Sequence, residues 1–143
     1  MVEARVPEHL FAYGTLRPGC APPSLARILR SASSLGSAWV PGRLYDLGSY
    51  PGAIAPLESR PPASRVHGEV LRLPDLASWL PELDAYEGFN PAARETSLFV
   101  RTTCTATLLS GHTLACWIYL YRGTPPAHAQ IPSGRWEGRS GLR

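Results

Sequence analysis

The longest run of β-branched residues predicts a two-stranded β-hairpin in the second half of the chain. Ser97–Leu108 carries one valine and four threonines, residue types that favour extended backbone. A second apolar and aromatic segment follows at 113–121, and residues 109–112 between them contain serine and glycine, as a hairpin turn requires. We therefore expect two long antiparallel strands here.

The position of the turn decides which residues of this hairpin face one another. If Ser110 and Gly111 are the central turn residues, Cys104 lies opposite Trp117 and not opposite Cys116, so a disulfide is not expected there. Side chains alternate along a strand, so three aromatic residues of the returning strand share a face that could line a pocket or belong to the core: Trp117, Tyr119 and Tyr121.

Composition excludes several classes of function. The 143 residues are expected to form one domain over 1–143, with 138–143 as a mobile tail, and 15 prolines with 13 glycines indicate many loops. The net charge of +3 comes from scattered arginines, so neither a nucleic-acid groove nor a membrane surface is expected as a partner. The sequence has no lysine, which excludes a Schiff-base lysine and a P-loop lysine. The oligomeric state is left open.

The stretch Leu10–Gly19 is expected to organise the rest of the chain. Its first four residues read as a short strand, which ends at Gly14, where the missing Cβ allows another group to approach the main chain. A strand that ends in Gly-Thr leaves backbone N–H groups pointing into one space. This arrangement is typical of a cradle for a carboxylate or an oxyanion, although a buried strand followed by a plain turn is the simpler interpretation.

A helix is predicted after Pro74, with Asp75 at its positive end and Gly88 as its stop. Its apolar face is defined by spacings of i, i+3, i+4, i+7 and i+11, and consists of Leu76, Trp79, Leu80, Leu83 and Glu87. Pro81 is expected to kink or split this helix. Glu87 continues the apolar stripe at the negative end of the helix dipole, where the ionised form is disfavoured. A general base needs such a position, and a frayed helix end with Glu87 in solvent is the alternative.

Three further segments are predicted to form strands: 38–47, as one strand interrupted at Pro41 or as two short strands, 53–57 and 65–73. Residues 31–37 are small and polar and are expected to form a loop, 48–52 a turn, and Ser24 the cap of a short helix. His67 and Glu69 point the same way in the last strand. An acid–base pair is conceivable there, but a solvated pair is favoured.

Four motifs in this order resemble the gamma-glutamylcyclotransferase-like superfamily: Tyr13-Gly14-Thr15-Leu16, Tyr50-Pro51-Gly52, Leu83-Asp84-Ala85-Tyr86-Glu87-Gly88 and the hairpin from Ser97 to Tyr121. The hairpin is similar to the family pattern Ser-x-Tyr-x-Arg followed by Ala-Trp-x-Tyr. Here Arg101 matches, Phe99 stands where Tyr is usual and Cys116 replaces Ala. The likeness covers nearly the full chain.

The resemblance implies an α+β fold, a small mixed barrel-like sheet with short flanking helices. It also implies an enzyme that needs no metal or cofactor and releases 5-oxoproline from a small gamma-glutamyl substrate. By this resemblance Glu87 is the catalytic acid and base, and the backbone of Tyr13, Gly14, Thr15 and Leu16 holds the substrate. Tyr119 is the next candidate, as a phenol that hydrogen-bonds the substrate. Tyr50 and Arg101 are weaker candidates, and Arg101 could instead pair with a structural carboxylate.

Other functions have less support. A non-catalytic binding or regulatory module on the same fold would have no need of Glu87. The histidines show no paired ligand spacing for a metal hydrolase, no GxSxG segment predicts a serine triad, and Cys20 lacks a placed partner histidine. The first residues lack the apolar core of a signal peptide, and the three cysteines form no CxxC. A cytoplasmic location with reduced thiols is therefore expected. The leaving amine or amino acid is not predicted.

Overall fold

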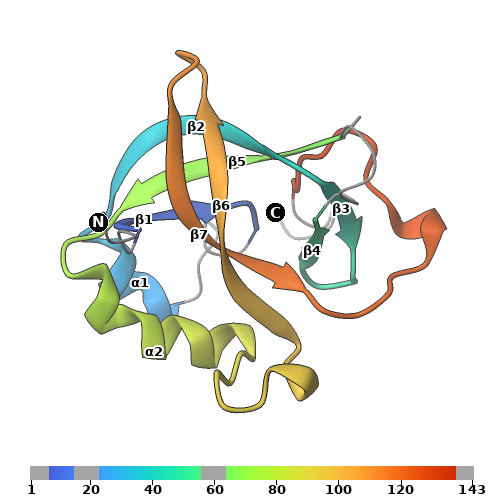
Figure 1. Cartoon of the computed structure of the whole chain (residues 1–143), viewed down its shortest axis with the longest axis horizontal. Helices are drawn as coiled ribbons and strands as arrows, with labels where there is room; N and C mark the ends of the chain where they lie inside the picture. Colours follow the sequence, from blue (N-terminus) through green and yellow to red (C-terminus); the bar gives the residue numbers. More distant parts are fainter. Residues whose placement is uncertain (1–6, 15–22, 56–63, 138–143) are drawn as a thin grey trace, which may run out of the picture.

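Five strands close into a barrel that forms the body of the protein (Figure 1). The computed structural model describes residues 7–14, 23–55 and 64–137. Around the barrel the strands follow the order β1 (His9–Ala12), β5 (Arg65–Arg72), β2 (Ser33–Pro41), β6 (Phe99–Leu108) and β7 (Thr113–Tyr121). The β1–β7 pair that closes the barrel is parallel and the other neighbours are antiparallel. The predicted mixed barrel with short helices is confirmed.

A small second sheet, β3 (Arg43–Asp46) paired with β4 (Pro51–Ile54), continues from the end of β2. The predicted turn lies between them, where the Leu47 N–H donates to the Tyr50 carbonyl at 3.0 Å. The strand after it begins at Pro51 rather than Ala53, because Pro51 and Gly52 already pair with β3.

Two helices cover one side of the barrel, α1 (Pro23–Leu29) and α2 (Leu76–Glu87) (Figure 1). Alternation along the strands divides the core into two layers. Leu10 and Ala12 of β1 face the helices, whereas Phe11 and Tyr13 face the barrel interior. α1 begins one residue before Ser24, so the expectation that Ser24 caps it is wrong.

α2 is one continuous helix of 12 residues, so Pro81 does not split it. Pro81 lies on the exposed face of the helix, and so does Ala77, whose carbonyl loses its intrahelical partner because proline has no N–H. The phase of the helix is therefore kept, and Leu76, Leu80 and Leu83 are buried as predicted. Asp75 precedes the helix in a left-handed conformation and makes no side-chain cap.

The β6–β7 hairpin differs from the prediction by one residue. The Gly111 N–H donates to the Leu108 carbonyl at 2.9 Å, and the Leu108 N–H donates to the His112 carbonyl at 2.8 Å. With Gly111 at a φ of 94°, this is a three-residue loop with a glycine bulge. Cys104 consequently lies opposite Cys116, and both are free thiols. The predicted Cys104–Trp117 pairing is wrong.

Residues 33–37, expected to be a loop, belong to β2. They have little strand propensity and are held by pairing with β5, with an irregularity around Gly36, whose φ is 104°. After β7 the chain returns to the barrel, where Trp136 is buried in the interior layer as its predicted anchor. The expected mobile tail, 138–143, lies outside the described residues. No helix in the described ranges is long and apolar enough to span a membrane.

Candidate active site

Segments from four parts of the sequence meet around one pocket of about 320 Å³. The end of β1 contributes Tyr13 and Gly14, the β3–β4 turn contributes residues 49–51, and the end of α2 contributes Tyr86 and Glu87. The hairpin adds residues from the start of β6 and from β7. Described residues from each of the four motifs noted in the sequence therefore line this pocket.

Glu87 is the last residue of α2, and its side chain lines the pocket. The helix ends in a Schellman motif: Gly88, at a φ of 72°, donates its N–H to the Ala85 carbonyl at 3.2 Å, and Phe89 donates to the Asp84 carbonyl at 2.9 Å. This motif fixes the position of the Glu87 backbone. Burial raises the pKa of the Glu87 carboxyl from 4.5 to about 7. Among the described residues, no group donates a hydrogen bond to it, so none of these residues offsets the loss of water.

Asp84, one helical turn before Glu87, is the residue whose role sequence reasoning missed. It is 5% exposed and is the centre of a polar cluster. Arg101 donates to both of its carboxylate oxygens, from Nε at 2.8 Å and from Nη2 at 3.2 Å, and the Tyr119 hydroxyl donates to Oδ1 at 2.7 Å. Arg101 and Tyr119 are directly opposed on β6 and β7, so the hairpin presents both to the helix. The alternative in which Arg101 pairs with a structural carboxylate is confirmed.

This cluster determines how Tyr119 can interact with a ligand. Burial, together with the hydrogen bond to Asp84, raises the pKa of the Tyr119 phenol well above its usual range. The phenol therefore stays protonated, and its single proton is directed to Asp84. Tyr119 also lines the pocket, where its oxygen can act only as a hydrogen-bond acceptor.

Tyr13 and Gly14 fix the opposite wall. The buried Tyr13 hydroxyl donates to the backbone carbonyl of Tyr119 and accepts from the Ala53 N–H at 3.2 Å, so it joins β1, β4 and β7. At Gly14 a Cβ atom would lie 2.7 Å from Pro51 Cγ, which explains why a glycine is needed there. Thr15 and Leu16, the other predicted cradle residues, lie outside the described residues.

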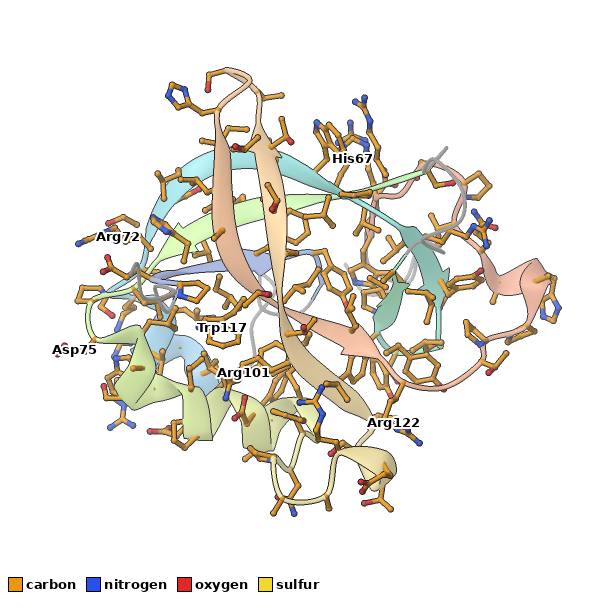
Figure 2. All side chains as sticks on the ribbon, in the orientation of Figure 1. His67, Arg72, Asp75, Arg101, Trp117 and Arg122 are labelled. Carbon is orange, nitrogen blue, oxygen red and sulfur yellow. The ribbon has the colours of Figure 1, made fainter. Side chains whose placement is uncertain are left out.

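The predicted aromatic face of β7 divides between the pocket and the core. Tyr119 lines the pocket, whereas Trp117 and Tyr121 pack in the layer between barrel and helices. The guanidinium carbon of Arg101 lies 4.4 Å from the centre of the Trp117 ring, and Figure 2 shows the two side chains together above α2. Arg101 is thus held by Asp84 and Trp117 and does not line the pocket, whereas Tyr50 does.

The remaining candidates do not join this site. His67 lies across the barrel from Arg101 (Figure 2) and borders a separate hollow with Glu69. Cys20 lies outside the described residues. Within the described ranges, no three His, Cys, Asp or Glu side chains are grouped as metal ligands would be.

Comparisons with known proteins agree with the fold and with the family that the motifs resemble. Residues 10–138 match the profile of the family described as gamma-glutamyl cyclotransferase, AIG2-like. A Vibrio cholerae protein with the provisional name gamma-glutamylcyclotransferase is 33% identical over 132 residues, which are 90% of this chain and 96% of that protein.

Two solved structures share the fold. An AIG2-like protein from mouse has a TM-score of 0.67 at 21% identity, and the match covers 97% of this chain and 95% of that one. YkqA from Bacillus subtilis has a TM-score of 0.64 at 22% identity. That match covers 92% of this chain but 40% of YkqA, so this chain spans less than half the length of YkqA.

Proposed function

Because the chain belongs to the gamma-glutamyl cyclotransferase, AIG2-like family, we propose that it is an active cyclotransferase in which Glu87 is the general acid and base. The reaction is an intramolecular aminolysis of a gamma-glutamyl amide, which yields 5-oxoproline and a free amine. The observation that carries the proposal is the carboxyl group of Glu87, placed by the end of α2 on the wall of the pocket, where burial raises its pKa to about 7. A group with this pKa accepts and returns a proton efficiently near neutral pH.

The chemistry needs one proton relay. The α-amine of the glutamyl group attacks its own γ-carbonyl carbon, and Glu87 takes one proton from the attacking nitrogen. The bond between the γ-carbon and the leaving nitrogen then breaks as Glu87 returns that proton to the leaving nitrogen. Because both reacting groups belong to one molecule, the main task of the pocket is to hold the substrate in a folded conformation.

Tyr119 is proposed to orient the attacking amine. Its hydroxyl proton is engaged by Asp84 at 2.7 Å, so its oxygen accepts a hydrogen bond from the amine N–H. In this role Asp84 and Arg101 are positioning residues, since they touch Tyr119 and not the substrate. A phenol without Asp84 would be free to rotate and to donate its proton instead.

The backbone amides of residues 14–16 are proposed to hold the α-carboxylate or the developing oxyanion, as the resemblance implies. Support comes from the resemblance and from the position of Gly14 on the pocket wall, packed against Pro51. The Tyr13 side chain has a supporting role, because its hydroxyl already bonds two backbone groups.

The test is release of 5-oxoproline from a panel of gamma-glutamyl amines and amino acids by the wild type and by Glu87→Gln. The substitution keeps the size of the side chain and removes the base, and we expect at least a thousandfold loss of kcat/KM with the fold retained. Glu82→Gln is the matched control, since Glu82 is an exposed carboxylate on the same helix outside the pocket. Equal activity of Glu87→Gln and the wild type would show that Glu87 is not the general acid and base. Binding of a panel member without turnover would indicate a binding module.

A further inference from the structure

A second hollow, of about 240 Å³, shares no lining residue with the pocket of Glu87. Figure 2 shows His67, which borders it, on the side of the barrel away from α2. Val66 and Val70 of β5 belong to the interior layer of the core, so His67 and Glu69 between them point outward. The polar side chains that line the hollow come from β2, β5 and the segment after β7: Ser37, His67, Glu69, Arg135 and Glu137.

The segment after β7 forms one wall of the hollow because it is held against β5. The His67 N–H donates to the Gly134 carbonyl at 2.8 Å. At Gly134, whose φ is 70°, a Cβ atom would overlap the carbonyl oxygen of Arg65, so the approach of the two segments requires glycine. Trp136 is then buried in the interior layer. Residues 135 and 137, on either side of this anchor, are thereby fixed at the hollow.

Opposite charges line this hollow without pairing with one another. Among the described residues, Arg135, Glu69 and Glu137 form no salt bridge. Glu69 accepts a hydrogen bond from the Ser34 hydroxyl at 2.7 Å through Oε2, which leaves its Oε1 for a second donor. Ser37 lies directly opposite Glu69 on β2. The hollow therefore offers a cation, two carboxylates and a hydroxyl group to one ligand.

The end of the hollow at His67 is positive. Burial lowers the pKa of the His67 imidazole, and Arg135 and Arg65 lower it further. Arg65 is held at this end because its guanidinium carbon lies 3.9 Å from the centre of the Trp39 ring. A neutral imidazole beside two guanidinium groups favours an anion. Glu69, two residues along β5, favours a cation about 7 Å away.

We propose that this hollow is a binding site for free α-amino acids, with the carboxylate of the ligand next to Arg135 and His67 and its ammonium group next to Glu69 and Ser37. Both charges of an α-amino acid are carried by one carbon atom, and with a hydrogen bond at each end they span an interval of about 7 Å. A simple anion would leave the carboxylates of Glu69 and Glu137 without a partner, and a simple cation would leave Arg135 without one. The inference does not depend on the proposed cyclotransferase function.

The test is a titration of the wild-type protein with glycine, L-alanine, L-serine and L-glutamate, followed by two-dimensional amide NMR. Saturable shifts are expected at residues 37, 67–69 and 135–137. Propionate is alanine without its ammonium group, and ethylamine is alanine without its carboxylate. Each should bind at least about tenfold more weakly than L-alanine, because it keeps one of the two charged contacts.

Charge-removing variants test the two ends separately. Arg135→Gln and Glu69→Gln should each weaken the binding of L-alanine about tenfold with a retained circular dichroism spectrum. Arg30→Gln and Glu95→Gln are the matched controls, since both residues are exposed and lie outside the hollow. In the wild type, saturation with L-alanine should raise the pKa of His67, measured from its imidazole proton shifts, because the bound carboxylate offsets the charge of Arg135. Ethylamine should not raise it.

The outcomes are distinct from those of the 5-oxoproline assay, which concerns the other pocket. Absence of a saturable shift with all four amino acids up to about 100 mM overturns the inference. Propionate or ethylamine that binds as tightly as L-alanine also overturns it, because one charge would then suffice. Equal loss of binding in Arg30→Gln and Arg135→Gln, or in Glu95→Gln and Glu69→Gln, overturns the assignment of the site to this hollow.

Discussion

At alkaline pH, the Glu87→Gln variant should have a higher free energy of unfolding than the wild type, although it lacks the activity. In the folded protein the Glu87 pKa is raised from 4.5 to about 7, so the folded state holds this proton more tightly than the unfolded state does. As the pH rises from about 4.5 to about 7, the unfolded state loses the proton first, and the free energy of unfolding falls. Glutamine does not titrate, so the variant lacks this loss.

The magnitude follows from the size of the pKa change. A shift from 4.5 to about 7 corresponds to about 3 kcal/mol at 1.36 kcal/mol for each pKa unit. The carboxyl lies at the wall of an open pocket, where water relieves part of this cost. We therefore expect the stability difference between Glu87→Gln and the wild type to grow by about 2 kcal/mol between about pH 5 and about pH 8, which is roughly 5 °C in Tm.

The assay is urea unfolding of both proteins at the two pH values, followed by circular dichroism. Other titrating groups are common to the two proteins, so they cancel in the difference between their free energies of unfolding. Glu82→Gln serves as the matched control for loss of a carboxylate, because Glu82 lies on the same helix, is exposed and does not line the pocket. A difference for Glu87→Gln that stays constant within about 0.5 kcal/mol would falsify the raised pKa. The pH profile of kcat/KM should show an acid limb near the same pKa of about 7.

Three further predictions concern the groups around the site. Tyr119→Phe should lower kcat/KM about tenfold to a hundredfold with a retained circular dichroism spectrum, because the amine loses its acceptor; an unchanged kcat/KM would contradict this role. Asp84→Ala leaves the partly buried guanidinium of Arg101 without its carboxylate and should lower the free energy of unfolding, measured in urea, by about 3 kcal/mol. A decrease of less than about 1 kcal/mol would show that the ion pair contributes little to stability. Burial raises the pKa of Cys104 to about 12 and that of Cys116 to about 11. In a Cys20→Ser background, alkylation of these two thiols near pH 8 should therefore be about a hundredfold slower than alkylation of a free thiol. Fast labelling of the folded protein would refute this prediction.

The position of Glu87 could be predicted from the sequence because helical phase is a local property. Three buried leucines of α2 set the face that meets the barrel, and the last residue of the helix follows at the same spacing. Gly88 marks the end of the helix for a reason that is equally local, since it adopts a left-handed conformation. The sequence could predict that another group packs closely against the main chain at Gly14. It could not predict that this group is Pro51, because Pro51 belongs to a turn that is distant in the sequence.

The polar cluster at Asp84 could not be predicted, because it depends on the register of the hairpin. An aspartate directly after Leu83 lies at the edge of the apolar stripe and could have been exposed. A two-residue turn would have placed Arg101 opposite Leu120, so that Arg101 and Tyr119 lay on opposite faces of the sheet. The glycine bulge instead places Arg101 opposite Tyr119, on the same face. The signal that could have revealed the cluster was the presence of an arginine in a strand that otherwise faces a helix.

Asp84 and Glu87, three residues apart on α2, lie in opposite environments. The environment of Asp84 suits a structural role, and that of Glu87 suits proton transfer. Asp84 accepts three hydrogen bonds from Arg101 and Tyr119, so its negative charge is compensated where it lies. Glu87 faces the pocket with no such donor among the described residues, and burial alone raises its pKa. Exchange of these environments would make Asp84 a proton carrier with no access to a ligand and Glu87 a fixed anion that cannot take up a proton near neutral pH. The division agrees with the roles proposed above, in which Asp84 orients Tyr119 and Glu87 carries the proton.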